Sequence, residues 1–372
     1  MISAQLSIMP AAKRALILSV GYGEGHHAAA RALKLELEGR GYGVQMCDPC
    51  ATAHPRIFEI TRRFYHLCVR RMPWLWGVTY AQTDTADWSL KAHSPILSDV
   101  TECIAGLVSE YKPQYIVCTY PLFAHMLDTL TREGRVTVPY AVIVTDSIEI
   151  SRPWMVTQAP LICLPDEHSL RLVSERYALR SERIVATGFP VRREFSSCKG
   201  RRRAPDSQNL RLVYGAYAPL NRVRSDLAAL VKTWPSAYIT VIAGGRCSAL
   251  ADFNCDRVSV IRRTDDMPTL FSESHFYIGK AGAATMFEAY SSELPVIVNY
   301  SLPGQEQGNL ALLLADGAGV TAGTTSELLT RVRGLLADGA AGWKRLTAAM
   351  QRAARTGAAA RIVDELERRF NV

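Results

Sequence analysis

The sequence predicts an α/β protein with two Rossmann-like domains, each built on a doubly wound parallel sheet. Two observations predict this class. Short apolar runs alternate with helix-forming segments along most of the chain, and a polar, arginine-rich stretch after residue 195 divides the alternation in two. The length of 372 residues suits two domains, since one domain usually takes roughly 100–200 residues.

Residues 1–195 are expected to form the first domain. Ala15–Val20 is an apolar run that stops at glycine, as a buried parallel strand does, and the helix-forming run Ala28–Glu38 follows it. Further short apolar runs predict strands at residues 44–47, 114–119, 140–145, 161–164 and 183–187.

Residues 196–207 predict a linker, because they are polar and include glycine and proline. Residues 208–355 are expected to form the second domain. Its strands are predicted at residues 210–214, 238–243, 258–261, 276–278 and 296–298. The tail, residues 356–372, predicts a helix with Ile362, Leu366 and Phe370 on one face, and we expect it to pack back on the first domain.

The formal charge of +8 and the pI of about 9.0 favour anionic partners. Nucleotide phosphates, nucleic acid and anionic lipid all fit this charge, as does an ordinary solvated surface. Only Arg201–Arg203 supports nucleic acid, and no recognition motif accompanies these arginines, so we expect no nucleic-acid partner.

Nothing in the sequence predicts secretion or a membrane-spanning helix. Met1–Pro10 is too short and mixed for a secretory signal, and no run of about 18 apolar residues occurs. The nine cysteines have no disulfide or zinc spacing, apart from Cys47 and Cys50, whose single C-x-x-C is weak evidence for a redox dithiol. We expect a cytoplasmic protein, which would lie on the inner face of the cell membrane if it meets lipid.

The segment Gly21–His27 joins the first predicted strand to the first helix. Its glycines let backbone amides approach a ligand, although their spacing is not that of the dinucleotide fingerprint. A helix N-terminus favours the neutral form of a histidine, and a neutral imidazole can act as a general base. Capping or packing is the alternative role for His26 and His27.

Asp146 directly follows the predicted strand at residues 140–145. An acid at the carboxyl end of a parallel strand lies where open sheets bind ligands, and there it can orient or polarise a base. A helix or turn cap is the alternative.

Two segments of the second half suit a nucleotide sugar. The turn at Gly279–Ala284 has small residues that expose amides to a diphosphate, and Glu288 can accept hydrogen bonds from a ribose diol. Lys280 can balance phosphate charge or can be a surface lysine. In Pro303–Asn309, the side chains of Gln305, Glu306 and Asn309 suit sugar hydroxyls, and a polar helix cap is the alternative.

Residues 57–80 mix aromatic and basic side chains, including Arg70, Arg71, Trp74 and Trp76. Tryptophans at the headgroup level and arginines near anionic lipid are typical of an interfacial anchor. An amphipathic packing helix is the alternative.

Together these segments resemble the glycosyltransferase family that contains monogalactosyldiacylglycerol synthases, processive diacylglycerol glucosyltransferases and the N-acetylglucosaminyltransferase of peptidoglycan synthesis. The resemblance covers about residues 14–320 and is closest to the glycerolipid branch. It is carried by residues 23–30, 138–139, 144–146, 154, 187–192, 266–268, 280–282, 288–289, 295–296, 303–306 and 309.

The resemblance implies a GT-B fold, with two Rossmann-like domains facing a central cleft, and an inverting transfer of a hexose from a UDP-sugar to diacylglycerol at an anionic membrane surface. It implies no cofactor or metal. It places His26 on the catalytic histidine and Asp146 on its acidic partner. The donor residues it implies are Gly188, Arg246, Gly282, Ala283, Thr285, Glu288, Gln305, Glu306 and Asn309, and the acceptor or membrane residues are Gly25, Arg70, Arg71, Trp74 and Trp76.

The sequence departs from the family's pattern in its second half. The glycine-rich loop is reduced to Gly215–Pro219, the usual Gly-Phe is Arg262-Arg263, and the usual Lys-Pro-Gly-Gly is Lys280–Ala283. These changes leave two alternatives open, a transferase with a polyprenyl-linked or other hydrophobic acceptor and a non-catalytic relative that binds a nucleotide sugar or a membrane.

Overall fold

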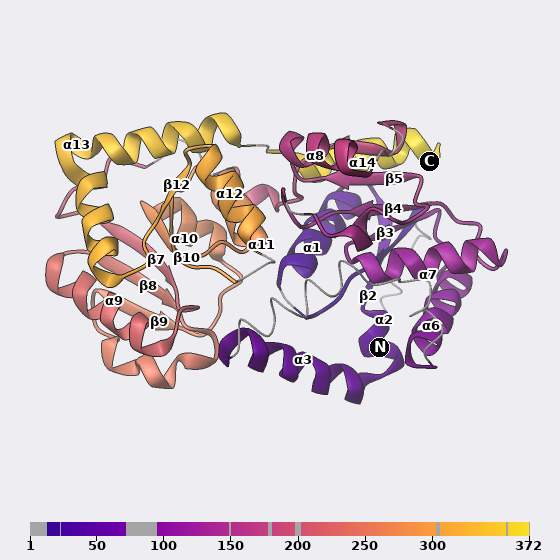
Figure 1. Ribbon diagram of the computed structural model, residues 1–372, viewed down its shortest axis with the longest axis horizontal. Coiled ribbons are helices and arrows are strands. Elements are labelled where there is room, and N and C mark those ends of the chain that lie inside the picture. The colour runs from indigo at the N-terminus through magenta and orange to yellow at the C-terminus, as the bar shows by residue number, and fades with distance from the viewer. Residues whose placement is uncertain are drawn as a thin grey trace, which may run out of the picture.

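The computed structural model describes residues 13–22, 24–71, 95–148, 150–177, 181–197, 202–302, 306–354 and 356–371. Figure 1 shows two lobes side by side, each with a sheet at its centre and helices around it. Both sheets have six parallel strands, in the orders β2-β1-β3-β4-β5-β6 and β12-β11-β10-β7-β8-β9. The prediction of two doubly wound parallel sheets is confirmed.

The first sheet is buried on both faces, as the apolar runs predict. Prolines begin four of the helices around it, because the ring fixes a helical φ and the missing N–H has no partner in the first turn anyway. The elements are β1 (Lys13–Leu18), α1 (Glu24–Gly39), β2 (Tyr42–Cys47), α2 (Pro49–Ala53), α3 (Pro55–Arg71), α6 (Pro95–Tyr111), β3 (Tyr115–Cys118), α7 (Pro121–Arg132), β4 (Tyr140–Ile143), β5 (Leu161–Leu164), α8 (Glu167–Tyr177) and β6 (Ile184–Ala186).

The second sheet repeats this plan. Its elements are β7 (Arg211–Gly215), α9 (Leu220–Thr233), β8 (Tyr238–Ile242), β9 (Val258–Ile261), α10 (Met267–Glu273), β10 (Phe276–Lys280), α11 (Ala283–Ser291), β11 (Val296–Tyr300), α12 (Gln307–Ala315), β12 (Gly319–Thr321) and α13 (Thr325–Ala353). The last helix of the chain is α14 (Ala358–Phe370).

Three element boundaries differ from the sequence prediction in ways that affect the site. The predicted strand at 140–145 ends at Ile143, so Thr145 and Asp146 stand in the following loop. The first helix begins at Glu24, four residues before its predicted start, so His26 and His27 lie in its first turn. The strand β12 has only three residues and gave no recognisable apolar run.

The chain crosses between the two halves a second time before α14. Figure 1 shows α14 in the lobe of the first sheet, where it packs against α1 and β5. Its apolar face is buried among residues of α1 and the first sheet, through Ala359, Ile362, Val363 and Leu366. The last helix of the chain therefore completes the core of the first half.

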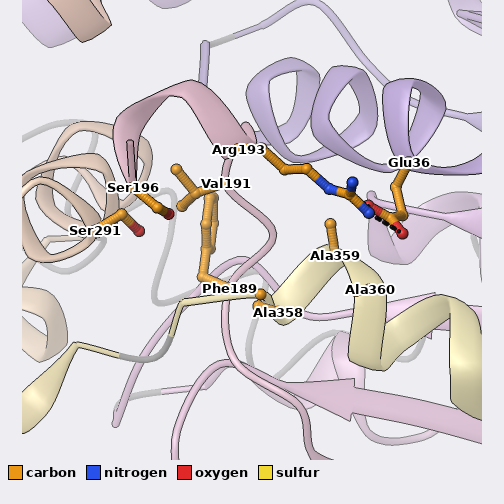
Figure 2. A pocket seen from close by; sticks show the side chains of 10 residues that line it. Glu36, Phe189, Val191, Arg193, Ser196, Ser291, Ala358, Ala359 and Ala360 are labelled. Carbon is orange, nitrogen blue, oxygen red and sulfur yellow. Dashed lines mark hydrogen bonds and ion pairs between the residues drawn. The ribbon is translucent and has the colours of Figure 1, made fainter. Parts of the chain in front are cut away.

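A buried carboxylate joins the elements at this crossing. The Glu36 side chain of α1 accepts two hydrogen bonds from the Arg193 guanidinium, at 2.9 and 2.8 Å, and a third from Arg40 at 3.0 Å. Figure 2 shows the Glu36–Arg193 pair beside the start of α14. The cavity next to it has a volume of about 30 Å³, which is too small for a sugar nucleotide.

A second buried carboxylate holds the C-terminal half together. Asp226 of α9 is fully buried and accepts hydrogen bonds from the Tyr214 hydroxyl at 2.9 Å and the Arg222 guanidinium at 2.6 Å. Asn299 and Thr325 donate to the same carboxylate, at 3.2 and 2.6 Å. One side chain thus links β7, β11, α9 and α13.

We expect Asp226→Ala to lower the free energy of unfolding by about 3–5 kcal/mol, because it removes the shared acceptor of a partly buried guanidinium and three other polar groups. Urea denaturation followed by circular dichroism measures this. Asp252→Ala is the control, since Asp252 pairs with Arg224 at the exposed surface of the same half and should change stability little. Equal effects of the two substitutions would show that the Asp226 network contributes no more to stability than an exposed ion pair does.

Candidate active site

His26 lies in the first turn of α1, at the edge where the strands of the first sheet end. Its Nδ1 is 2.9 Å from the Thr145 hydroxyl oxygen, and its ring packs edge-on against Tyr120 and 6.0 Å from the Trp154 ring centroid. Burial lowers the pKa of His26 to about 4, partly opposed by a hydrogen bond to the Thr119 backbone. The imidazole is therefore neutral at physiological pH.

Asp146 follows Thr145 but has a different partner. Its side chain is buried, and its Oδ2 accepts a hydrogen bond of 2.7 Å from the Trp154 indole. Burial raises the pKa of Asp146 to about 6, although the indole hydrogen bond favours the charged form. The group that meets His26 Nδ1 is thus the Thr145 hydroxyl, and Asp146 orients the tryptophan that packs near the histidine. The sequence analysis did not single out Thr145.

The loop that carries these groups has a strained residue. Ile148 has a φ of 57°, a left-handed conformation that is rare for a β-branched side chain. The Ser169 hydroxyl accepts a 2.8 Å hydrogen bond from the Ile148 amide and donates one of 2.7 Å to Asp166. Such strain is kept where the surrounding structure fixes a loop, and it occurs most often at functional sites.

His27 points away from His26. Its Nδ1 is 2.8 Å from the Ser19 hydroxyl oxygen, and its Nε2 would lie 3.2 Å from a Cβ at Gly21. The Gly21 amide donates to Asp48 at 2.9 Å. His27 therefore packs the glycine loop against β1 and β2, while His26 faces the loop after β4.

The surroundings of Cys50, the second thiol of the C-x-x-C pair, oppose formation of its thiolate. Burial raises the pKa of the Cys50 thiol to about 12, and the nearby Asp48 carboxylate adds to the effect. A redox-active cysteine needs a lowered pKa.

The helix α3 borders the entrance to this region. On its inner side, Phe58 and Tyr65 contact the Tyr22 ring, with centroids 5.1 and 6.1 Å apart, and Thr61 hydrogen-bonds the Tyr22 hydroxyl at 2.9 Å. On its outer side, Ile57, Ile60 and Phe64 are 40%, 66% and 59% exposed. Their spacing of three and four residues places them on one face of the helix.

Part of the predicted membrane segment lies outside the described residues. This applies to Trp74 and Trp76 and to the side chains of Arg70 and Arg71. Gly25, predicted with them, lies in the first turn of α1 next to His26, where a Cβ would have no neighbouring atom within 4 Å.

In the C-terminal half, α11 begins at the end of β10 without a side-chain cap. Gly282 is its N-cap, and the first amide bonded within the helix is that of Met286, to the Gly282 carbonyl. The amides of Ala283, Ala284 and Thr285 therefore have no acceptor inside the helix and can meet an anion. Glu288 follows within the same helix and is partly buried.

Lys280 is not the isolated surface lysine that the sequence left possible. It forms an ion pair with Glu306, whose side chain is only 4% exposed. The second Glu306 oxygen accepts a hydrogen bond of 3.0 Å from the Leu302 amide. Asn309 is buried and donates to the Ala281 carbonyl at 3.1 Å, which ties α12 to the turn before α11. Gln305 lies outside the described residues.

The Arg246 side chain binds backbone carbonyls, and Gly188 provides a backbone conformation that favours glycine. The Arg246 guanidinium donates to the carbonyls of Ala216, at 2.9 Å, and Ala218. It thereby holds the loop that replaces the family's glycine-rich turn. Gly188 follows β6 with a φ of 96°, which favours glycine.

The two sets of residues face the same region because α1 and α11 pack together. Ala29 of α1 is buried in one cluster with Phe287 of α11. The helix that carries His26 therefore rests on the helix whose first three amides have no acceptor within the helix.

The comparisons with known proteins agree with this geometry. Residues 26–191 match the family model of monogalactosyldiacylglycerol (MGDG) synthase. The processive diacylglycerol beta-glucosyltransferase of Bacillus cytotoxicus is 25% identical over 339 residues, which cover 87% of this chain and 86% of the relative. That of Bacillus cereus (strain B4264) is 25% identical over 345 residues, with the same coverage.

Solved structures show the same fold at low identity. MurG of Acinetobacter baumannii has a TM-score of 0.62 at 15% identity, over 96% of this chain and 99% of its own. The glycotransferase of kitacinnamycin has a TM-score of 0.65 at 13% identity, over 97% and 100%. UDP-GlcNAc 2-epimerase from Neisseria meningitidis has a TM-score of 0.59 at 13% identity, over 95% and 100%.

These matches confirm the predicted resemblance, the GT-B fold and the class of enzyme, a hexosyltransferase. None of the described helices is both long and apolar enough to span a bilayer.

The pH dependence of stability should separate His26 from Asp146. The pKa of His26 falls from 6.5 to about 4 on folding, so the folded protein binds fewer protons than the unfolded chain in this range, and this group makes stability rise with pH. The pKa of Asp146 rises from 3.8 to about 6, so the folded protein binds more protons, and this group makes stability fall with pH.

We expect Asp146→Asn to gain about 2 kcal/mol of stability relative to the wild type as the pH rises from 4 to 6, because the variant lacks the Asp146 titration that lowers wild-type stability over this range. Chemical denaturation across this range measures the difference. His26→Ala is the reciprocal variant, and it should lose the increase of stability with pH that the His26 titration causes. A constant difference between Asp146→Asn and the wild type at every pH would show that Asp146 does not titrate there.

Proposed function

We propose that the protein is an inverting glycosyltransferase that moves a hexose from a UDP-sugar to diacylglycerol at a membrane surface, in glycolipid synthesis. The observation that carries the proposal is a neutral, partly buried histidine on α1, a helix that packs against α11, whose N-terminus has no side-chain cap. The first group suits a base for an acceptor hydroxyl, and the second suits the leaving diphosphate. The curated relatives named above support the acceptor class.

His26 serves as the base in this scheme. When the Thr145 hydroxyl accepts from Nδ1–H, the lone pair of Nε2 is left to take the proton of the acceptor hydroxyl. A pKa of about 4 makes a weak base, but the negative charge of a bound diphosphate favours the imidazolium and raises that pKa. Donor binding thus makes His26 a stronger base.

The acceptor oxygen then attacks the anomeric carbon on the side opposite the diphosphate, so the anomeric configuration inverts. The leaving diphosphate gains negative charge as the glycosidic bond breaks. The free amides of α11 and the positive end of its dipole stabilise this charge. Glu288, farther along α11, is our candidate for the ribose hydroxyls.

The outer face of α3 is our candidate for membrane contact. Ile57, Ile60 and Phe64 form an exposed apolar stripe, and the exposed Arg56 and Arg63 stand beside it. An apolar face with basic neighbours is the pattern of a helix that lies in the interface of an anionic membrane. The inner face of the same helix contacts Tyr22, so a lipid entering there arrives beside the loop that carries His26.

A transfer assay with labelled UDP-glucose, UDP-galactose and UDP-N-acetylglucosamine, and diacylglycerol in anionic vesicles, tests the reaction. We expect one donor to label the lipid and His26→Ala to reduce the rate roughly 100- to 10,000-fold, the usual contribution of a general base. His27→Ala is the matched control, because that imidazole faces Ser19, and its loss should be far smaller. Nucleotide binding without transfer would favour another hydrophobic acceptor or a non-catalytic role.

Vesicle binding tests the membrane surface separately. The double substitution Ile60→Glu and Phe64→Glu should weaken co-sedimentation with anionic vesicles roughly 10- to 100-fold, since it removes two side chains that insert into the interface. UDP binding should be unchanged. Leu172→Glu is the control, because Leu172 is also exposed but lies on α8, on the opposite side of the N-terminal half from α3 in Figure 1. If both variants bind vesicles like the wild type, α3 is not the membrane face.

A further inference from the structure

The Lys280–Glu306 ion pair occupies the place where the proposed reaction needs an anion. A Cβ built on Gly282, the N-cap of α11, would lie 3.1 Å from the Lys280 ammonium and 3.5 Å from Glu306 Oε1. The pair is thus packed directly against the start of the helix whose amides are unused. Figure 1 shows α11 on the side of the C-terminal half that faces α1.

The two partners are held differently. Glu306 is fixed, since its side chain is 4% exposed and its other oxygen accepts the Leu302 amide. Lys280 is less enclosed, with a side chain that is 25% exposed and an ammonium 5.2 Å from the Tyr217 ring centroid. A lysine has a long flexible stem, so it can change partner without moving the backbone.

The electrostatics favour a change of partner when an anion arrives. A cation near a helix N-terminus is disfavoured by the dipole, and here Glu306 compensates for it. Burial lowers the pKa of Lys280, but the Glu306 charge more than offsets this, and the pKa stays above its ordinary value. The ammonium therefore keeps its charge, and a diphosphate, with more charge than one carboxylate, competes for it.

We propose that donor binding exchanges this ion pair: Lys280 moves from Glu306 to the diphosphate, and the released Glu306 carboxylate accepts hydrogen bonds from the hexose hydroxyls. This inference rests on the proposed function, because it assumes a sugar diphosphate as the donor. No covalent bond changes in the exchange. The Glu306 carboxylate can therefore accept hydrogen bonds from the hexose only after the diphosphate has bound.

The buried surroundings are consistent with a preformed site. Asn309 holds the Ala281 carbonyl with its Nδ2, and its buried Oδ1 has no hydrogen-bond partner among the described residues. The turn at 280–282 is therefore braced from α12, so the side chains can exchange while the turn stays in place. After transfer the hexose has left, and Glu306 can take Lys280 back, which favours release of the nucleoside diphosphate.

Calorimetric titration of the full chain with pyrophosphate, UDP and the UDP-hexose tests the exchange. We expect Glu306→Gln to bind pyrophosphate and UDP about tenfold more tightly than the wild type, because the competing carboxylate is gone. The preference for UDP-hexose over UDP should shrink in the same variant. Lys280→Met should weaken all three ligands about tenfold or more, and the Glu306→Gln gain should vanish in the double variant.

Asp364→Asn is the matched control, because it also removes one carboxylate charge from an ion pair, that with Arg40, far from the cleft. It should leave all three affinities unchanged. Glu306→Asp keeps the charge but has a shorter side chain, so it should bind pyrophosphate and UDP more tightly than the wild type, by a smaller factor than Glu306→Gln. This variant replaces Glu306→Gln in the test if Glu306→Gln does not fold.

Folded Glu306 variants that bind pyrophosphate and UDP no more tightly than the wild type would overturn the exchange and make the pair a fixed brace. Such a result beside active lipid transfer would leave the proposed function standing. A gain with pyrophosphate but no UDP binding would support the exchange and reject uracil as the base of the donor nucleotide. A wild-type protein that binds neither ligand would overturn both proposals.

Discussion

The parallel arrangement of the two sheets is the constraint on which the candidate site depends. Parallel strands end at one edge of a sheet, so the loops after them gather there. Thr145 and Asp146 follow β4, Arg246 follows β8, Lys280 is the last residue of β10, and Glu306 follows β11. Side chains alternate between faces along a strand and its extension, so a slip of one residue in β4 would exchange the positions of Thr145 and Asp146. The chemistry at His26 therefore depends on where a four-residue strand ends.

Burial gives the cleft its electrostatic character. It opposes charge on both His26 and Asp146, which is why their pKa values move in opposite directions. It also explains why Lys280 is found with Glu306, since an ammonium taken from water needs a counter-ion. His26 is thus neutral, and Lys280 and Glu306 are paired, before a ligand binds. An anionic donor is the partner that disturbs this balance most.

Local patterns in the sequence were enough for much of the fold, because a buried parallel strand is an uninterrupted apolar run and a helix start has its own residue preferences. They identified most strands and both histidines. They could not identify contacts between distant turns. Lys280 and Glu306 are 26 residues apart, and Arg246 meets a loop 30 residues earlier. Whether Thr145 or Asp146 meets His26 depends on the end of β4, which an apolar pattern extending to residue 145 did not reveal.

The helix α3 relates the surface of the molecule to these charges. Its outer stripe is exposed, while its inner residue Tyr65 packs near Tyr22. Burial raises the pKa of Tyr65, and its hydroxyl also senses the charges of Lys280, Glu306 and Asp146, so this side chain lies near groups of both halves. In the function we propose, this helix of 17 residues would bring a membrane surface within one helix diameter of the candidate site. A lipid hydroxyl would then reach His26 while its acyl chains remain in the membrane, which is the geometry that a water-soluble donor and an insoluble acceptor require.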